Sequence, residues 1–211
     1  MELRSLSELL NTKITCWSCG SNQVALPFCE ACKKIQEHPA ALGPFETLRE
    51  PVSLYIDTDA LRQKYLTLSK SIHPDRFINS NPREALYASR WAREINQSYP
   101  ALKEVLPRAE ALLDHFKKDD LLKKGNVPFD LAEDYFEFQE QAADGAPVSV
   151  WQPFLDKLQS HRTSILQKQK EFEGLAKWDE KSLKELAAWI TFQRYLNSME
   201  NDIKRRIQCP S

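Results

Sequence analysis

Two closely spaced cysteine pairs are the residues of this chain with the clearest chemistry. Cys16 and Cys19 form one Cys-x-x-Cys pair, and Cys29 and Cys32 form a second pair after nine intervening residues. This spacing can bring four thiolates onto one tetrahedral metal ion. Gly20 follows the first pair and suits the tight turn that such a site needs, because glycine tolerates a positive φ. The pattern therefore predicts a metal site with all four cysteines as ligands.

A structural zinc ion is the favoured occupant of this site. Four thiolates leave no open position for a substrate, and closed sites of this kind are most often zinc. A segment of some forty residues with few apolar groups folds poorly alone, so the metal would supply folding energy. Two disulfides, a redox-active pair, and iron in place of zinc remain alternatives. Cys209 has no partner in the sequence and is expected to be a bystander.

The tripeptide His73-Pro74-Asp75 is the second group whose residue types suggest a function. A stiff proline holds an imidazole and a carboxylate together, which suits contact with another molecule better than packing. The bare tripeptide is a weak signal, because it also occurs by chance in turns. Its function must therefore be inferred from the secondary structure predicted on either side of it.

Two helical patterns flank the tripeptide. The leading pattern places apolar residues four, three and four apart: Leu61, Tyr65, Leu68 and Ile72. This spacing predicts one apolar face of a helix. Its other sides carry the basic residues Arg62, Lys64 and Lys70. Asp57 is the expected N-cap of this helix, and Asn81 followed by Pro82 is expected to begin the next one. The tripeptide thus occupies the loop of a helical hairpin whose first helix is basic.

The second helix of the hairpin should run past residue 102. Its expected buried side consists of Ala88, Trp91, Ile95 and Leu102. Pro100 lies within it, and because proline lacks an N–H and clashes with the preceding turn, we expect a kink there. A short helix is expected at residues 45–48, before the hairpin.

Three more helical patterns follow, at about residues 128–143, 150–175 and 179–207. Long helices joined by short loops predict an antiparallel three-helix bundle. Phe136 lies off the core seam of the first helix, and Tyr195 lies on the flank of the seam of the last. Each helix thus carries a large aromatic residue that its own core does not require. One interpretation is that these residues are ordinary surface aromatics, or that they lie on helices buried on two sides. The other is that they form a shared protein-binding patch.

Composition limits the possible classes of protein. The chain has 211 residues, 42% of them hydrophobic, enough for one large or two to three small domains. A net charge of −1 argues against general binding to nucleic acids or anionic membranes. No apolar run reaches the length of a membrane span. Residues 1–8 lack a signal-peptide core and are too acidic for a typical mitochondrial presequence. We expect a cytoplasmic protein, with a processed protein of the mitochondrial matrix as the alternative.

The hairpin resembles the J-domain, by which DnaJ-type co-chaperones engage DnaK-type chaperones. Three further strings make the chain similar to the HscB/Jac-type J-proteins of iron–sulfur cluster assembly. These are Ile-His-Pro-Asp-Arg-Phe at 72–77, Ile-Asn-Gln-Ser-Tyr at 95–99 and Leu-Pro-Arg-Ala-Glu-Ala-Leu-Leu at 106–113. Some members of that family, notably eukaryotic ones, carry a similar Cys-Trp-x-Cys-Gly…Cys-x-x-Cys extension.

The fold class is accordingly expected to be all-α, with a small four-cysteine zinc module at the N-terminus. The expected domains are the zinc module at 1–40, the J-domain at 41–117 and the three-helix bundle at 118–211.

The resemblance also implies roles for residues. The residues implied to bind the chaperone are His73, Pro74, Asp75, Arg62, Lys64, Lys70 and Arg76. In this scheme Asp75 pairs with a basic residue of the chaperone, Pro74 fixes the loop and His73 orders it. The residues implied to bind the scaffold protein IscU are Ala132, Phe136, Glu137, Glu140 and Tyr195. Ala132 and Glu133 depart from the family, which usually places larger apolar residues there.

The expected function is that of a co-chaperone without enzymatic activity. It would stimulate the ATPase of a DnaK-type (HscA-like) chaperone and deliver the IscU scaffold to it. A general protein-folding J-protein with another client is the first alternative. A metal-dependent enzyme using the cysteine site with His73 or His115 is weakly supported, because no glycine-rich phosphate loop or Cys–His nucleophile pair is evident. Zinc-ribbon binding of nucleic acid conflicts with the charge balance.

Overall fold

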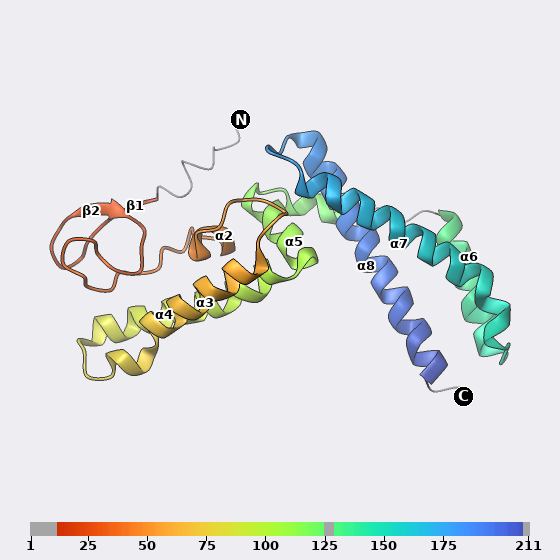
Figure 1. Cartoon of the computed structure of the whole chain (residues 1–211), viewed down its shortest axis with the longest axis horizontal. Coiled ribbons are helices and arrows are strands. Elements are labelled where there is room, and N and C mark those ends of the chain that lie inside the picture. Colours follow the sequence, from red (N-terminus) through yellow and green to blue (C-terminus); the bar gives the residue numbers. More distant parts are fainter. Residues whose placement is uncertain (1–11, 125–128, 209–211) are drawn as a thin grey trace. The chain divides into compact units, whose positions relative to one another are not determined.

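Helices dominate the computed structural model, which describes residues 12–124 and 129–208. The chain divides into two compact units, one ending at Phe116 and the other beginning at Lys117 (Figure 1). The cysteine pairs and the hairpin fall in the same unit, and the expected three-part division stays a prediction. The first eight residues and Cys209 lie outside the described residues. Within the described residues, no helix is long and apolar enough to cross a bilayer.

In its described part, residues 12–116, the N-terminal unit contains a small β-ribbon and four α-helices. Its elements are β1 (Lys13–Thr15), β2 (Asn22–Val24), α2 (Pro44–Leu48), α3 (Thr58–Ile72), the 3₁₀ helix η1 (Pro74–Phe77), α4 (Pro82–Lys103) and α5 (Val105–His115). The two strands pair antiparallel, with Ile14 opposite Gln23. Apart from this short ribbon, the unit is helical, which confirms the expected fold class.

The helical hairpin forms as the sequence predicts. The Asp57 carboxylate accepts the backbone N–H groups of Asp59 and Ala60, and the Asn81 side chain accepts that of Arg83. These caps satisfy N–H groups that have no partner within the helix. The expected inner residues Leu61, Ile72, Ala88, Trp91, Ile95 and Leu102 are all buried. α3 and α4 therefore lie antiparallel and side by side (Figure 1).

Aromatic contacts reinforce the middle of this hairpin. The rings of Tyr65 in α3 and Tyr99 in α4 stack with their centroids 4.2 Å apart. The Tyr65 hydroxyl also donates to Asn96 Oδ1 at 3.0 Å. Because stacked rings bury area and fix orientation, they limit sliding of one helix along the other. α4 continues through Pro100, and the kink expected there stays a prediction.

Arg108 closes the turn between α4 and α5. Its guanidinium is buried and donates to the carbonyls of Leu102 and Leu54, both at 2.6 Å, and of Lys103 at 2.9 Å. The carbonyls of Leu102 and Lys103 belong to the last turn of α4, where no further helical N–H is available. A charged residue thus completes the end of a helix and joins it to the segment before α3. No pattern in the sequence indicates this role of Arg108.

A buried contact between a carboxylate and an imidazole connects α2 with the end of α5. One carboxylate oxygen of Glu46 lies 2.9 Å from His115 Nδ1, and the other accepts the Gly43 N–H at 3.0 Å. Burial alone would raise the pKa of Glu46, but the hydrogen bond from His115 and the backbone donors lower it below its usual value. The short α2 is therefore fixed at both its first turn and its side.

The C-terminal unit contains η2 (Asp119–Lys124), α6 (Phe129–Ala143), η3 (Val148–Trp151), α7 (Gln152–Glu173) and α8 (Glu180–Gln208). α7 runs back against α6, and α8 runs back against α7, as in the expected bundle (Figure 1). The core includes Leu131 and Phe138 of α6 and Leu186, Trp189 and Leu196 of α8. Asp179 caps α8 as predicted, accepting the Ser182 N–H at 2.7 Å.

We predict that Arg108→Met destabilises the N-terminal unit by about 3 kcal/mol. The change leaves three carbonyls without their donor in a buried place, and each loss costs roughly 1–3 kcal/mol before relaxation. Urea unfolding monitored by circular dichroism measures the effect. Arg62→Met removes the same charge from an exposed site on α3 and should cost less than about 0.5 kcal/mol. Equal midpoints for the two variants would contradict the role assigned to Arg108.

Candidate functional site

The four predicted cysteine ligands come together at one point. Their sulfur atoms all lie within 4.8 Å of one another. Cys16 Sγ is 3.6 Å from Cys32 Sγ, and Cys19 Sγ is 3.7 Å from Cys29 Sγ. A tetrahedral ion with sulfur ligands at about 2.3 Å requires sulfur atoms about 3.8 Å apart. All four thiols are free, so the geometry fits a single bound metal ion and not a pair of disulfides.

Two similar backbone turns hold the sulfur atoms in place. Gly20 N–H donates to the Cys16 carbonyl at 3.0 Å, and Lys33 N–H donates to the Cys29 carbonyl at 2.9 Å. Both residues have a positive φ, 75° for Gly20 and 61° for Lys33. The sequence predicted this turn only for the glycine. A lysine in the left-handed region costs roughly 1–2 kcal/mol, which the surrounding contacts must offset.

Backbone N–H groups point at the sulfur atoms from within each turn. Cys16 Sγ accepts from the N–H of Ser18 at 3.4 Å and of Cys19 at 3.5 Å. Cys29 Sγ accepts from the Cys32 N–H at 3.5 Å. That donor and the Ser21 hydroxyl lower the pKa of the Cys29 thiol to about 6. The turns thus stabilise negative charge on sulfur, the form that binds a metal.

Cys32 differs from Cys29 in the direction in which the pKa of its thiol is shifted. The Lys34 N–H lowers the pKa of Cys32, but burial and the three neighbouring thiols outweigh it and raise the pKa to about 11. Four thiolates so close together repel one another, and a divalent ion removes that repulsion. Metal binding should therefore release protons from the site.

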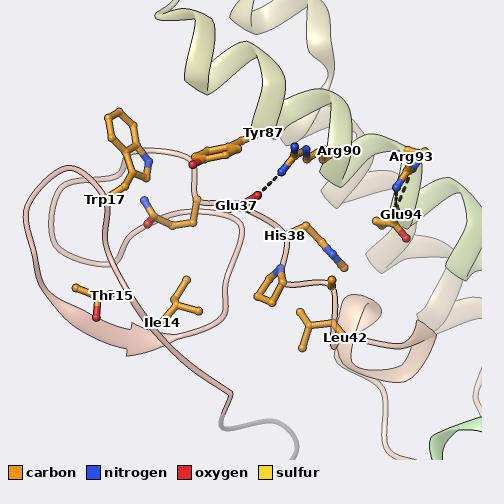
Figure 2. A pocket seen from close by; sticks show the side chains of 13 residues that line it. Ile14, Thr15, Trp17, Glu37, His38, Leu42, Tyr87, Arg90, Arg93 and Glu94 are labelled. Atoms are coloured by element: carbon orange, nitrogen blue, oxygen red, sulfur yellow. Dashed lines mark hydrogen bonds and ion pairs between the residues drawn. The ribbon is translucent and has the colours of Figure 1, made fainter.

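The cysteine module packs on the first half of α4. Lys34 Nζ lies 3.1 Å from a carboxylate oxygen of the buried Glu84, and Arg83 lies over the Trp17 ring at 5.0 Å. Glu37 pairs with Arg90, and Trp17 meets Tyr87 edge to face (Figure 2). A cavity of about 870 Å³ lies between these contacts. The metal site is therefore anchored to the helix that follows the His-Pro-Asp loop.

The segment after the module belongs to the core of the hairpin domain. The Trp91 indole N–H donates to the Gln36 carbonyl at 2.9 Å, and the His38 ring meets Trp91 edge to face at 4.4 Å. His38 Nε2 also lies 3.0 Å from the Thr47 hydroxyl of α2. Burial lowers the pKa of His38, so the ring is neutral at pH 7. The segment around His38 is thus packed between α2 and α4.

The His-Pro-Asp tripeptide lies exposed between α3 and α4. The His73 side chain is 58% exposed and that of Asp75 is 76% exposed. His73 Nδ1 accepts the Asp75 N–H at 3.4 Å, and the Arg76 N–H donates to the His73 carbonyl at 3.0 Å. Pro74 begins the short η1 helix. The tripeptide is therefore an ordered, accessible corner, as the sequence predicts.

The predicted basic residues are not equivalent. Arg62, Lys70 and Arg76 are exposed, and an Arg76 N–H donates to the Lys70 carbonyl at 3.3 Å. Lys64 instead pairs with Glu50 and donates to the Arg49 carbonyl at 3.1 Å. The positive charge of Lys64 is thus largely neutralised by a residue of the same unit. Sequence spacing alone did not reveal this, because Glu50 lies before the helix.

An exposed leucine completes the basic side of α3. Leu66 is 47% exposed and lies four residues from both Arg62 and Lys70, so the three form one stripe. An apolar side chain between two cations suits contact with an acidic and partly apolar surface. Sequence reasoning missed it, although its spacing from the two basic residues was a usable signal.

The C-terminal unit presents two exposed aromatics on α6. Phe136 is 64% exposed, which agrees with its position off the core seam, and Phe129 is 77% exposed. They are seven residues apart and thus lie on the same side of the helix. Sequence reasoning missed Phe129. The predicted Glu137 and Glu140 are exposed as well, and Ala132 is half-buried.

Tyr195 has a partner within the bundle. Its ring meets the ring of Tyr135 edge to face at 6.3 Å, and burial raises the pKa of its hydroxyl. The Tyr135 hydroxyl donates to Asp202 of α8 at 3.1 Å. Tyr195 is therefore half-buried, and only part of its ring is available to a partner. Because Tyr135 precedes Phe136, these contacts join α8 to the helix that carries Phe136.

Curated relatives match the chain mainly over part of its length. A co-chaperone protein HscB homolog from Haemophilus influenzae is 36% identical over 71 residues, 34% of this chain and 41% of the relative. An HscB homolog from Burkholderia thailandensis is 29% identical over 129 residues, 59% of this chain and 73% of the relative. The chain thus spans about two fifths of the first relatives it matches. No family model matches it.

The structure extends this likeness along most of the chain. The crystal structure of human co-chaperone protein HscB superposes with a TM-score of 0.68 and 20% identity, covering 92% of this chain and 98% of the human one. Chaperone HscB from Vibrio cholerae gives a TM-score of 0.56 at 22% identity, covering 79% and 98%. The chain thus has the fold of these HscB structures and resembles HscB homologs in sequence over part of its length. It combines this fold with a four-cysteine cluster.

We predict that the metal stabilises the N-terminal unit, including its hairpin. Cys29→Ser should abolish stoichiometric metal binding and lower the free energy of unfolding by several kcal/mol, because Trp17 and Lys34 lose their fixed positions against α4. Native mass spectrometry and urea unfolding measure the two effects. Cys209→Ser removes a cysteine outside both pairs and should change neither. An unchanged unfolding midpoint in metal-free Cys29→Ser would contradict this coupling.

Proposed function

We propose that this protein is an HscB-type co-chaperone of iron–sulfur cluster assembly. The observation that carries the proposal is the exposed His-Pro-Asp corner at the end of a basic, rigidly packed helical hairpin. In our proposal the corner docks on a DnaK-type (HscA-like) chaperone and stimulates its ATPase. Asp75 forms a charge-assisted pair with a basic residue of that chaperone. The protein itself performs no chemistry.

The stripe of Arg62, Leu66 and Lys70 is proposed to guide this encounter. Exposed cations raise the association rate with an acidic surface, and the effect weakens as salt screens the charges. Leu66 adds apolar contact once the surfaces meet. Lys64 contributes less in this proposal than its charge suggests, because Glu50 already neutralises it. The chaperone contact thus depends on one edge of α3 and the adjoining loop.

The C-terminal bundle is proposed to hold the client. Phe129 and Phe136 offer exposed aromatic anchors, and Glu137 and Glu140 surround them with negative charge. Ala132 and Tyr195 are proposed to complete the surface that binds an IscU-type iron–sulfur scaffold. Holding chaperone and scaffold on one chain raises the effective concentration of each for the other. An Arabidopsis thaliana relative, the iron–sulfur cluster co-chaperone protein HscB homolog, supports this choice of client. It is 30% identical over 94 residues, 44% of this chain and 37% of the relative.

The cysteine site is proposed to hold one structural zinc ion. Zinc accepts four thiolates in a tetrahedron and leaves no position for substrate. Cytoplasm is the proposed location, with the mitochondrial matrix as the alternative. A general folding J-protein with a different client remains the second candidate, because the hairpin alone does not select a client.

We expect His73→Gln to abolish ATPase stimulation and to leave scaffold binding intact. Glutamine keeps the size of the side chain but changes the group that accepts the Asp75 N–H, so the corner loses its order. Steady-state ATPase of a DnaK-type chaperone, with and without scaffold, measures the effect. Asn79→Gln, in the same exposed loop, is the matched control and should stimulate normally. Full stimulation by His73→Gln would overturn the proposed role.

Phe136→Ala should weaken binding of an IscU-type scaffold by about 2 kcal/mol, roughly 30-fold. The change removes an exposed anchor without opening a cavity in the core. Isothermal titration calorimetry with purified scaffold measures it, and Tyr195→Ala should have a smaller effect on binding. Leu166→Ala removes a similarly exposed apolar residue from α7 and serves as the control. Indifference of scaffold binding to both aromatic changes favours the general folding role.

A further inference from the structure

The two turns of the cysteine site are similar in their backbones but differ at one side chain. Cys16 N–H donates to the Ser21 carbonyl at 2.8 Å, and Cys29 N–H donates to the Lys34 carbonyl at 2.9 Å. Ser21 and Lys34 therefore occupy equivalent positions in the two turns. Lys34 extends away from the sulfur atoms to reach Glu84 in α4. Ser21 does the opposite and directs its hydroxyl at the sulfur atoms.

The Ser21 hydroxyl connects one ligand from each cysteine pair. Its Oγ lies 3.2 Å from Cys19 Sγ and 3.3 Å from Cys29 Sγ. A hydroxyl has one proton, so it donates to one of these sulfur atoms at a time. Donation to a thiolate is a charge-assisted hydrogen bond, which draws electron density away from sulfur. The contact thus spans the two halves of the site.

Cys19 is the ligand that most needs this contact. Cys16 and Cys29 are buried and Cys32 is half-buried, whereas Cys19 is exposed. Cys16 and Cys29 receive backbone N–H groups, as described above. Within the described part of the chain, the Ser21 hydroxyl is the one non-thiol donor found at Cys19 Sγ. An exposed thiolate without a donor is the sulfur at which oxidants, electrophiles and competing ligands would first attack.

We propose that Ser21 is a positioning residue of the metal site that retains the ion and shields Cys19 from attack. Its hydroxyl orients the two cysteine pairs around the ion and lowers the nucleophilicity of the exposed sulfur. Loss of such an outer contact typically weakens metal binding 10–100-fold. This inference rests on the proposed metal site but is independent of the chaperone and scaffold contacts.

The test compares Ser21→Ala with Ser18→Ala in the full-length chain. Ser18 is exposed in the same turn, and alanine keeps the backbone N–H that it donates to Cys16. Zinc affinity is measured by competition with a chelator, and the Co²⁺-loaded protein is examined by absorption spectroscopy. Ser21→Ala should bind zinc about 10-fold more weakly. Its sulfur-to-cobalt charge-transfer band should move to longer wavelength, because sulfur without its donor holds its electrons less tightly.

A chemical probe locates the effect on one ligand. Iodoacetamide alkylates a thiolate with loss of iodide, and peptide mass spectrometry identifies which cysteine reacts first. In zinc-loaded Ser21→Ala, alkylation should begin at Cys19 and proceed several-fold faster than in the wild type or in Ser18→Ala. Unchanged affinity, band position and alkylation in Ser21→Ala would overturn the inference. Absence of Zn²⁺ and Co²⁺ binding by the wild type would instead overturn the metal proposal itself.

Discussion

Burial of the Trp91 side chain holds the N-terminal unit together. Its indole N–H reaches the Gln36 carbonyl and its ring meets His38, so the chain leaving the cysteine module is fixed against α4. α4 also packs on α3 through Ala88 and Ile95, which are fully buried. One helix therefore fixes both the hairpin and the module. Because a free hairpin loop is ordered only if its two helices are, the His-Pro-Asp corner depends on this same packing.

The two units divide the proposed work of the protein. The N-terminal unit offers a rigid basic edge for a chaperone, and the C-terminal unit offers exposed aromatics among acidic residues for a scaffold. The two surfaces offer charged and exposed apolar side chains, which are the features that recognition of another protein requires. A metal ion held by all four cysteines would leave no position for a substrate.

Several contacts that matter for the proposed site are long-range pairs. Lys64 looks like a member of the basic face, but Glu50 pairs with it from the segment before α3. Arg108 looks like a surface charge of α5, but it donates to carbonyls of α4 and to Leu54. Lys33 adopts the left-handed conformation that glycine has in the other turn. For Lys64 and Arg108 the residue type indicates one environment, and a partner distant in sequence supplies another.

Local patterns in the sequence were sufficient to predict the helices, their caps and the cysteine cluster. Apolar spacing, Asp57, Asn81 and the two Cys-x-x-Cys pairs act over a few residues, so their consequences can be worked out without the fold. The position of Phe136 off the core seam of α6 could be worked out in the same way, but its exposure could not, because burial on a second side was an open alternative. The folded structure was also needed to show where the module packs, which basic side chains remain free and that Ser21 reaches two sulfur atoms. Those outcomes depend on which distant segments of the chain come into contact, and local periodicity does not predict such tertiary contacts.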